Sequence, residues 1–295
     1  MPGETTTAAL ADSLPTMRMG ARTVLEQKGG TRDTVDRVTL GKGVGNSWSE
    51  VDFAKISAQS ISETTDIIDN PQQLSDTLTT ITPSDSGIHI LYTDRVADRI
   101  IGEASAIVRS GRLAMNALLR KQDIDLITQG QAASQDLGTA GNPLTSNLVR
   151  ASKYRISSNT TEPGNGPYHM QHHGFCLKDI DDELTAAVGT YEVTSGITAD
   201  VYANSYNKAP RMVGDVMVDE NGNITIDASE DAEGFVYDRN GIILVEGRGM
   251  RTEFQRRGNI GGGSTSVYAY FEYAAGFRSS GNWQKSITAD ATNPA

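Results

Sequence analysis

One run of helical periodicity limits the fold of this chain more than any other feature. Residues 93–130 read TDRVADRIIGEASAIVRSGRLAMNALLRKQDIDLITQG. Apolar side chains recur there every three or four positions, which is the spacing of one helix face. We therefore predict a helix over about residues 94–128, with Thr93 or Asp94 as its N-cap.

The length of this helix bears on the shape of the whole protein. Unbroken, it would be about 50 Å long at 1.5 Å per residue, which exceeds the usual globular helix. The helix either spans a flat, elongated subunit or bends at Gly102 and at Ser110-Gly111.

Overall composition excludes several functional classes. The 295 residues carry a net charge of -11, which argues against a protein that grips nucleic acid through a basic groove. The chain is long enough for one large domain or two lobes. Its single cysteine, Cys176, rules out an intrachain disulfide and fits a reducing compartment. We find no secretory signal, and the most apolar window, residues 268–277, is too short to cross a bilayer.

The segment before the long helix has a different amino-acid composition. Residues 29–65 are rich in glycine, threonine and charge, and their alternation is too broken for a core strand, so we predict a long exposed hairpin or lobe. Trp48 and Phe53 are apolar side chains on this polar segment. They would suit docking on a neighbouring subunit. The alternative is that they fold back on their own chain.

The remaining patterns mix helices and strands. We predict a strand over residues 87–92, a helix over about 145–157 and several strands over 213–247, where Asn221-Gly222 and Asn240-Gly241 are hairpin signals. Residues 1–28 read as a polar N-terminal arm, and the C-terminal part alternates like strands. The order indicates an α+β fold.

The stretch YHMQHHGFCLKDIDDEL, residues 168–184, invites a metal or catalytic interpretation. On a helix, His169, His172, His173 and Cys176 would share one face. The preceding Gly-Pro and the alternation favour a strand instead, in which His169 and His173 would lie about 13 Å apart. We predict a strand and turn over residues 168–176, followed by an amphipathic helix that starts at about Lys178 and whose acidic residues face solvent. A soluble metal-binding protein or enzyme built around residues 168–184 remains the alternative.

No other motif predicts catalysis. The segment GKGVGNS, residues 41–47, lacks the order of a phosphate-binding loop, and the chain contains no G-x-S-x-G. We therefore predict no enzyme, no catalytic residue, no cofactor and no metal.

The order of these parts resembles the tailed-bacteriophage major capsid proteins of the Hong Kong 97-like fold. The run TDRVADRIIGEASAIVRSGRLAMNALLRKQDIDLI is similar to the helix that follows the extended E-loop in one branch of that family. GPYHMQHHGFCLKDIDDEL resembles that branch's strand and helix, and YAYFEYAAGFRSSGNWQKSITADA resembles its closing strands. Together they cover residues 29–291, although no single motif is specific.

The resemblance implies a division of the chain and a function. It implies an N-terminal arm at residues 1–28, an E-loop at 29–65, and an axial domain at 188–264. The peripheral domain would span 66–187, with the spine helix at about 94–128, and strands at about 265–295 would complete it.

The implied function is that of a subunit in an icosahedral head enclosing double-stranded DNA. The subunits would form hexamers and pentamers. Portal, scaffold and possible decoration proteins are the expected partners, without a membrane or sequence-specific DNA binding. The protein would be made in the bacterial host cytoplasm and reside in the virion. Another virion structural protein, such as a tail or decoration subunit, is a further alternative.

Overall fold

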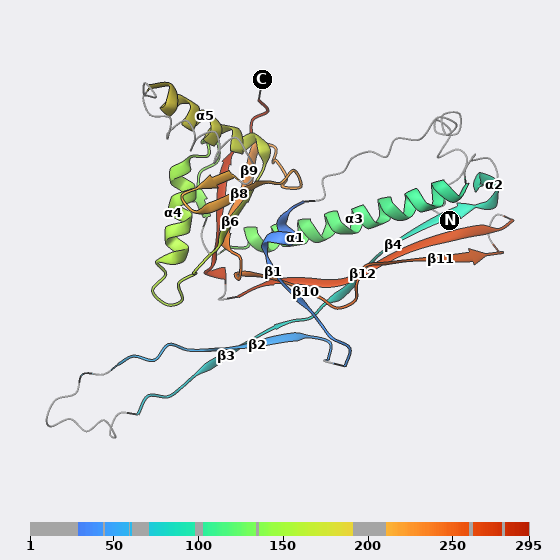
Figure 1. Ribbon diagram of the computed structural model, residues 1–295, viewed down its shortest axis with the longest axis horizontal. Coiled ribbons are helices and arrows are strands. Elements are labelled where there is room, and N and C mark those ends of the chain that lie inside the picture. The colour runs from blue at the N-terminus through green and yellow to red at the C-terminus, as the bar shows by residue number, and fades with distance from the viewer. Residues whose placement is uncertain are drawn as a thin grey trace.

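The fold consists of an elongated part, a more compact part and a projecting hairpin (Figure 1). The computed structural model describes residues 29–43, 45–58, 60, 71–97, 103–133, 136–190, 211–259, 262–278 and 281–294. The long helix α3 runs along the elongated part and reaches the compact part at its C-terminal end.

Helix α3 confirms the main sequence prediction. It spans Glu103–Gln131 and continues through Ser110-Gly111 without interruption. Its 29 residues correspond to about 43 Å. A short helix, α2 (Asp94–Ala97), begins where we predicted the long helix to begin. Gly102, the other position at which we considered a bend, lies outside the described residues.

The elongated part is a five-stranded sheet packed against α3. Strand β12 is central: β4 pairs along one edge, β10 and β11 pair in succession along the other, and β1 adds to β10 in parallel. Alternate side chains of β12, including Val267, Ala269 and Phe271, are buried, and α3 contacts this strand. The strands are β1 (Asp36–Thr39), β4 (Ser84–Thr93), β10 (Ile242–Glu246), β11 (Arg251–Arg257) and β12 (Ser264–Phe277).

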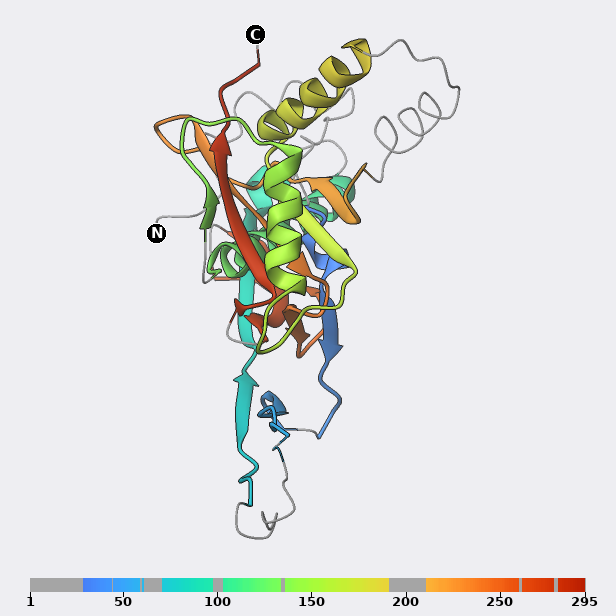
Figure 2. The same cartoon turned by 90° about the vertical axis from the view of Figure 1, so that its left-hand side faces the viewer.

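The compact part contains a six-stranded mixed sheet in the order β5-β13-β9-β6-β8-β7. Its strands are β5 (Asp136–Gly138), β6 (Tyr168–His172), β7 (Arg211–Val213), β8 (Val216–Glu220), β9 (Asp231–Asp238) and β13 (Gln284–Asp290). Helices α4 (Ser146–Ser157) and α5 (Gly174–Thr190) accompany this sheet, and α4 lies across it in Figure 2. The short helix α1 (Thr31–Thr34) contacts α3.

The projecting hairpin lies later in the chain than the sequence suggested. Strand β2 (Trp48–Phe53) pairs in antiparallel fashion with β3 (Asp76–Ile81), so the second strand begins after residue 65. Residues 31–39 form α1 and β1, and β1 belongs to the five-stranded sheet. The predicted hairpin range 29–65 is therefore wrong at both ends. The threonine-rich sequence of β3 gave no strong sign of a strand.

The expected division at residues 188 and 264 also fails to follow the sheets. Strand β11, placed in the range 188–264, pairs with β12 in the elongated sheet. Strand β6, placed before residue 188, pairs with β8 and β9 in the compact sheet. The chain changes sheets more often than a linear division allows.

Both predicted Asn-Gly hairpins are also wrong. The turn at Asn240-Gly241 carries the chain from β9 in the six-stranded sheet to β10 in the five-stranded sheet. After Asn221-Gly222 the chain does not return to pair with β8. Ile226 instead forms an isolated β-bridge with Ala232. A tight hairpin does join β7 to β8, through Gly214 and Asp215, which both have positive φ.

Candidate assembly surfaces

The histidine-rich stretch forms a buried strand followed by a helix, as predicted, although the helix starts earlier than expected and includes Cys176. All five residues of β6 are buried, and α5 begins at Gly174. His169 and His172 lie on opposite faces of the strand because their positions differ by an odd number. Within the part of the chain that the structure describes, no group of three or more His, Cys, Asp or Glu residues could hold a metal ion.

Burial keeps His172 and Cys176 in their neutral forms. The His172 ring is fully enclosed, and its Nδ1 accepts a hydrogen bond from the His173 backbone N–H at 3.0 Å. This burial lowers the pKa of His172 to about 4. Burial also raises the pKa of the Cys176 thiol to about 12, so a reactive thiolate is disfavoured. Both side chains therefore fit a structural role.

The acidic residues of this stretch are half-buried at Asp179 and exposed at Glu183, where the prediction that they face solvent holds, and both residues also bind the segment at the start of α4. Asp179 accepts a hydrogen bond from the backbone N–H of Leu144 at 3.3 Å. Glu183 accepts two from Ser146, from the N–H at 2.8 Å and the hydroxyl at 2.9 Å. Since the first N–H groups of a helix lack partners within it, α5 side chains stabilise the start of α4.

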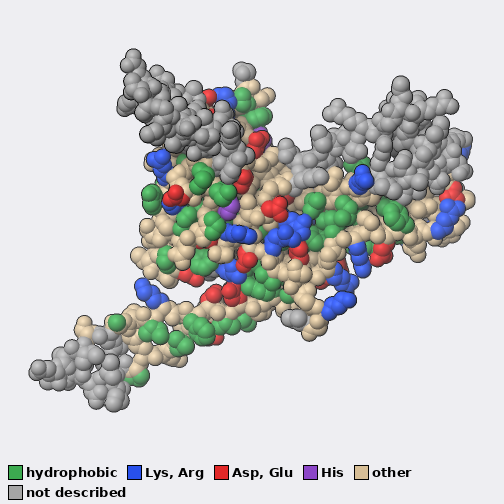
Figure 3. Space-filling view, in the orientation of Figure 1, with side chains coloured by type: hydrophobic (Ala, Val, Ile, Leu, Met, Phe, Trp, Pro, Cys, Tyr) green, Lys and Arg blue, Asp and Glu red, His purple; other side chains and the backbone are tan. Residues whose placement is uncertain are grey.

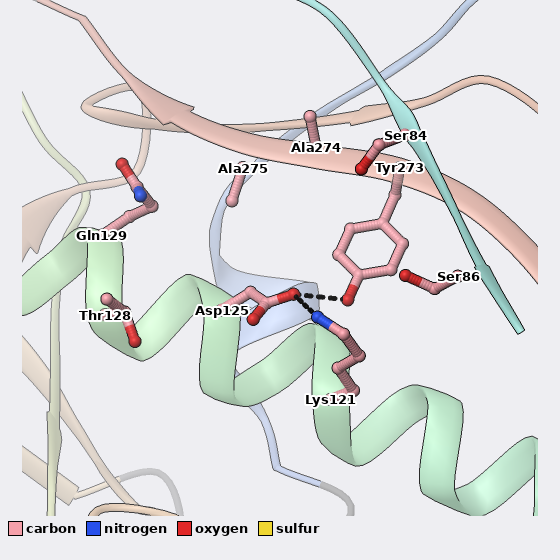
Figure 4. A pocket seen from close by; sticks show the side chains of 9 residues that line it. All are labelled: Ser84, Ser86, Lys121, Asp125, Thr128, Gln129, Tyr273, Ala274 and Ala275. Carbon is pink, nitrogen blue, oxygen red and sulfur yellow. Dashed lines mark hydrogen bonds and ion pairs between the residues drawn. The ribbon is translucent and has the colours of Figure 1, made fainter.

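A polar pocket lies between α3 and the elongated sheet (Figure 4). Asp125 accepts a hydrogen bond from the Tyr273 hydroxyl at 2.6 Å and pairs with Lys121 at 2.7 Å. Burial, together with the neighbouring Asp125 carboxylate, raises the pKa of Tyr273. These groups partner one another across helix and sheet, which indicates that they hold β12 to α3.

The hairpin presents a continuous apolar face to solvent. Val51 lies directly opposite Leu78, and Phe53 points the same way because it is two positions from Val51. The exposed fractions are 46% for Val51, 63% for Leu78 and 68% for Phe53. Figure 3 shows apolar side chains along this projection. We call Val51, Phe53 and Leu78 the hairpin face.

The base of the hairpin, in contrast, is fixed to its own chain. Trp48 packs against a small core cluster that contains Ile81, Ile243 and Val245. The guanidinium of Arg278 lies 5.5 Å from the centre of the Trp48 ring. Trp48 therefore packs against its own chain, which is the alternative expectation. Phe53 is exposed, as docking on a neighbouring subunit would require.

Arg278 is the residue at this base that sequence reasoning missed. Its side chain pairs with Glu50 on β2 and with Asp36 on β1, at 2.5 and 2.8 Å. These partners lie 228 and 242 residues away in sequence. No local pattern could have joined them.

Comparison with known proteins identifies similar structures but no similar sequences. No family model matches the chain, and no curated protein matches it either. The head structure of Helicobacter pylori bacteriophage KHP40 is similar over 93% of this chain and 94% of that chain, with TM-score 0.69 and 10% identity. A structure from Mycobacterium phage Che8 is similar over 91% of this chain and 94% of that chain, with TM-score 0.63 and 13% identity.

The same fold also occurs outside these phage structures. The holo-SrpI encapsulin complex from Synechococcus elongatus PCC 7942 is similar over 99% of this chain and 98% of that chain, with TM-score 0.62 and 11% identity. Identities this low show the fold alone. They confirm the predicted α+β, Hong Kong 97-like capsid fold.

Proposed function

We propose that this chain is the major capsid protein of a tailed phage, self-assembling into hexamers and pentamers of an icosahedral head around double-stranded DNA. The likeness to phage head and capsid structures over more than nine-tenths of the chain supports this function. The apolar hairpin face is the observation in this chain that carries it. An isolated two-stranded hairpin is only marginally stable in water, so a projecting one gains stability from a partner.

The hairpin face has the chemistry of an intersubunit contact. Burying a side chain such as valine, leucine or phenylalanine contributes about 1.5–3 kcal/mol, and three such side chains lie together here. The Arg278 contacts at the base restrict the hairpin before it docks. Such preorganisation lowers the entropy lost on binding. We therefore assign Phe53 to a contact with a neighbouring subunit.

We assign the parts of the head subunit by the sheets rather than by continuous ranges. The hairpin is the E-loop. The five-stranded sheet with α3 as spine helix is the peripheral domain, and the six-stranded sheet with α4 and α5 is the axial domain. The N-terminal arm expected at residues 1–28 lies outside the residues that the structure describes.

The surroundings of the subunit follow from the same proposal. Portal, scaffold and decoration proteins are its partners, and the virion is its final location after synthesis in the host cytoplasm. A net charge of -11 suits a container, since a strongly basic wall would bind the genome. The subunit encloses DNA without reading its sequence and needs no catalytic residue.

The encapsulin likeness supplies a second candidate, a shell without a phage genome. Electron microscopy of the protein co-expressed with its scaffold and protease tests both. Closed shells that protect DNA from nuclease are expected for a head. Empty or protein-filled shells would favour the second candidate. Persistent monomers would contradict both, and tubes, rings or trimers would indicate another virion protein.

A further inference from the structure

A buried carboxylate on α3 gathers hydrogen bonds from two distant segments. Asp123 is 2% exposed. It accepts hydrogen bonds from the Thr31 backbone N–H at 3.2 Å and from the side-chain amides of Asn221 and Asn223, each at 2.9 Å. The Asn221 amide also donates to the Thr31 hydroxyl at 3.0 Å. Hydrogen bonds to an ionised acceptor are stronger than neutral ones.

These contacts join the two sheets through the long helix. Thr31 begins α1, which leads directly into β1 of the five-stranded sheet. Asn221 and Asn223 follow β8 of the six-stranded sheet. Asp123 therefore connects a segment from each sheet to one point on α3.

The backbone around this point is shaped to reach the carboxylate. Gly29 has φ +70°, and a Cβ there would lie 1.9 Å from Cγ of Asp123, so a side chain would displace the carboxylate. On the other side, the Asn221 backbone N–H donates to the His172 carbonyl, and the Asn221 side chain accepts from the Asn223 N–H, each at 3.0 Å. The turn is thereby held in place before it meets Asp123.

A second set of contacts holds the C-terminal end of α3 independently. The Gln131 side chain donates to the Glu233 carbonyl, and the Gln284 side chain donates to the Gln129 carbonyl, each at 2.7 Å. Gly130 packs against the Phe235 ring. Weakening Asp123 should therefore free α1 and the Asn221 turn without detaching α3.

We propose that Asp123, with Thr31, Asn221 and Asn223, is a latch that fixes the angle between the two sheets, and that this angle sets the curvature of the shell. Asp123 is a positioning residue, since it acts through the segments it holds. A closed assembly of repeated subunits depends on the rotation between neighbours, so a looser angle allows several closing radii. The inference about shell curvature rests on the proposed shell function, whereas the inference that Asp123 fixes the angle between the sheets does not.

The test compares Asp123→Asn with Asp182→Asn, the same substitution at an exposed position of α5 whose ion pair stays within that helix. Asn at position 123 keeps the side-chain volume and one acceptor oxygen. Its NH2 group, however, would face one of the N–H donors that now bind the carboxylate. Hydrogen exchange of peptides covering residues 29–40 and 216–226 is measured in the purified protein, before any shell forms. We expect exchange at least about tenfold faster in Asp123→Asn, as loss of a charged hydrogen bond implies. Asp182→Asn should match the wild type there.

Equal exchange in Asp123→Asn and wild type, or equal acceleration in both variants, would overturn the latch. If Asp123→Asn does not fold, Asn223→Ala decides: it removes one donor to the same carboxylate, and we expect about tenfold faster exchange, the low end for one charged hydrogen bond. No change would overturn the proposal. Particle diameters measured by cryo-electron microscopy then test curvature. A broader range of particle diameters in Asp123→Asn would support the link to curvature. A range equal to that of the wild type, despite faster exchange, would refute this link.

Discussion

Strand β12 and the β2–β3 hairpin have opposite relations to their own chain. In β12, the alternate side chains Val267, Ala269 and Phe271 are buried, and α3 contacts the strand. On the hairpin, Val51, Phe53 and Leu78 alternate in the same manner, yet all remain exposed. The same period-two pattern therefore lies in the core of the subunit in one region and on an exposed surface, which we propose to be an intersubunit contact, in the other. We therefore expect substitutions in β12 to lower the stability of the subunit and substitutions on the hairpin face to impair assembly.

The largest effect is expected in the core of β12. Phe271→Ala removes a ring that is 2% exposed, and such a cavity costs about 3–5 kcal/mol. The free energy of unfolding, measured by urea denaturation, should fall by that amount, and assembly should fail because the subunit is unstable. A loss below about 1 kcal/mol would show that α3 does not cover this position as described.

Acid should weaken the other buried sheet through His172. The unfolded histidine binds a proton below about pH 6.5, whereas the folded pKa is about 4. This contribution to stability is fully present above pH 6.5 and is lost as pH falls to 4. The loss is about 3 kcal/mol. Burial also lowers the pKa of His169 and His173, so both act in the same direction.

Urea midpoints between pH 7 and pH 4 measure this effect. Because many carboxylates also titrate there, His172→Gln supplies the reference. Its midpoint should change less with pH than that of the wild type. Parallel curves for the two proteins would disprove the assignment to His172.

Much of the fold could be predicted from the sequence, but only where the residues that contact one another are close together in the chain. Helical spacing located α3 and α4, and alternation located β6 and β4. Asn221 misled because its side chain binds Asp123 instead of closing a hairpin. The hairpin was misplaced because β3 carries few apolar residues, and its anchor at Arg278 depends on partners more than 200 residues away. Long-range pairing of this kind leaves no periodic signal.

An intermediate effect is expected where the hairpin joins the body. Arg278→Ala removes ion pairs to Glu50 and Asp36. Charged hydrogen bonds of this kind contribute about 2 kcal/mol, and the loss should fall mainly on the hairpin. Hydrogen exchange should quicken in residues 48–53 and 76–81 and stay unchanged in β6. Faster exchange throughout the protein would mean that Arg278 supports the whole core.

The smallest effect on subunit stability is expected at the hairpin face. Phe53→Ser replaces a ring that is 68% exposed, and such surface substitutions usually change stability by less than about 0.5 kcal/mol. The thermal midpoint of the unassembled subunit should therefore stay near that of the wild type. Phe254→Ser on β11, where the ring is 54% exposed, is the matched control. A large drop for Phe53→Ser alone would place that ring in the subunit core.

Assembly of these two variants tests the central claim most directly. Sedimentation and electron microscopy should show Phe53→Ser as folded subunits that fail to close shells, while Phe254→Ser and the wild type form closed particles under the same conditions. Normal shells from Phe53→Ser, or equal failure of both variants, would contradict the assignment of the hairpin face as the intersubunit contact.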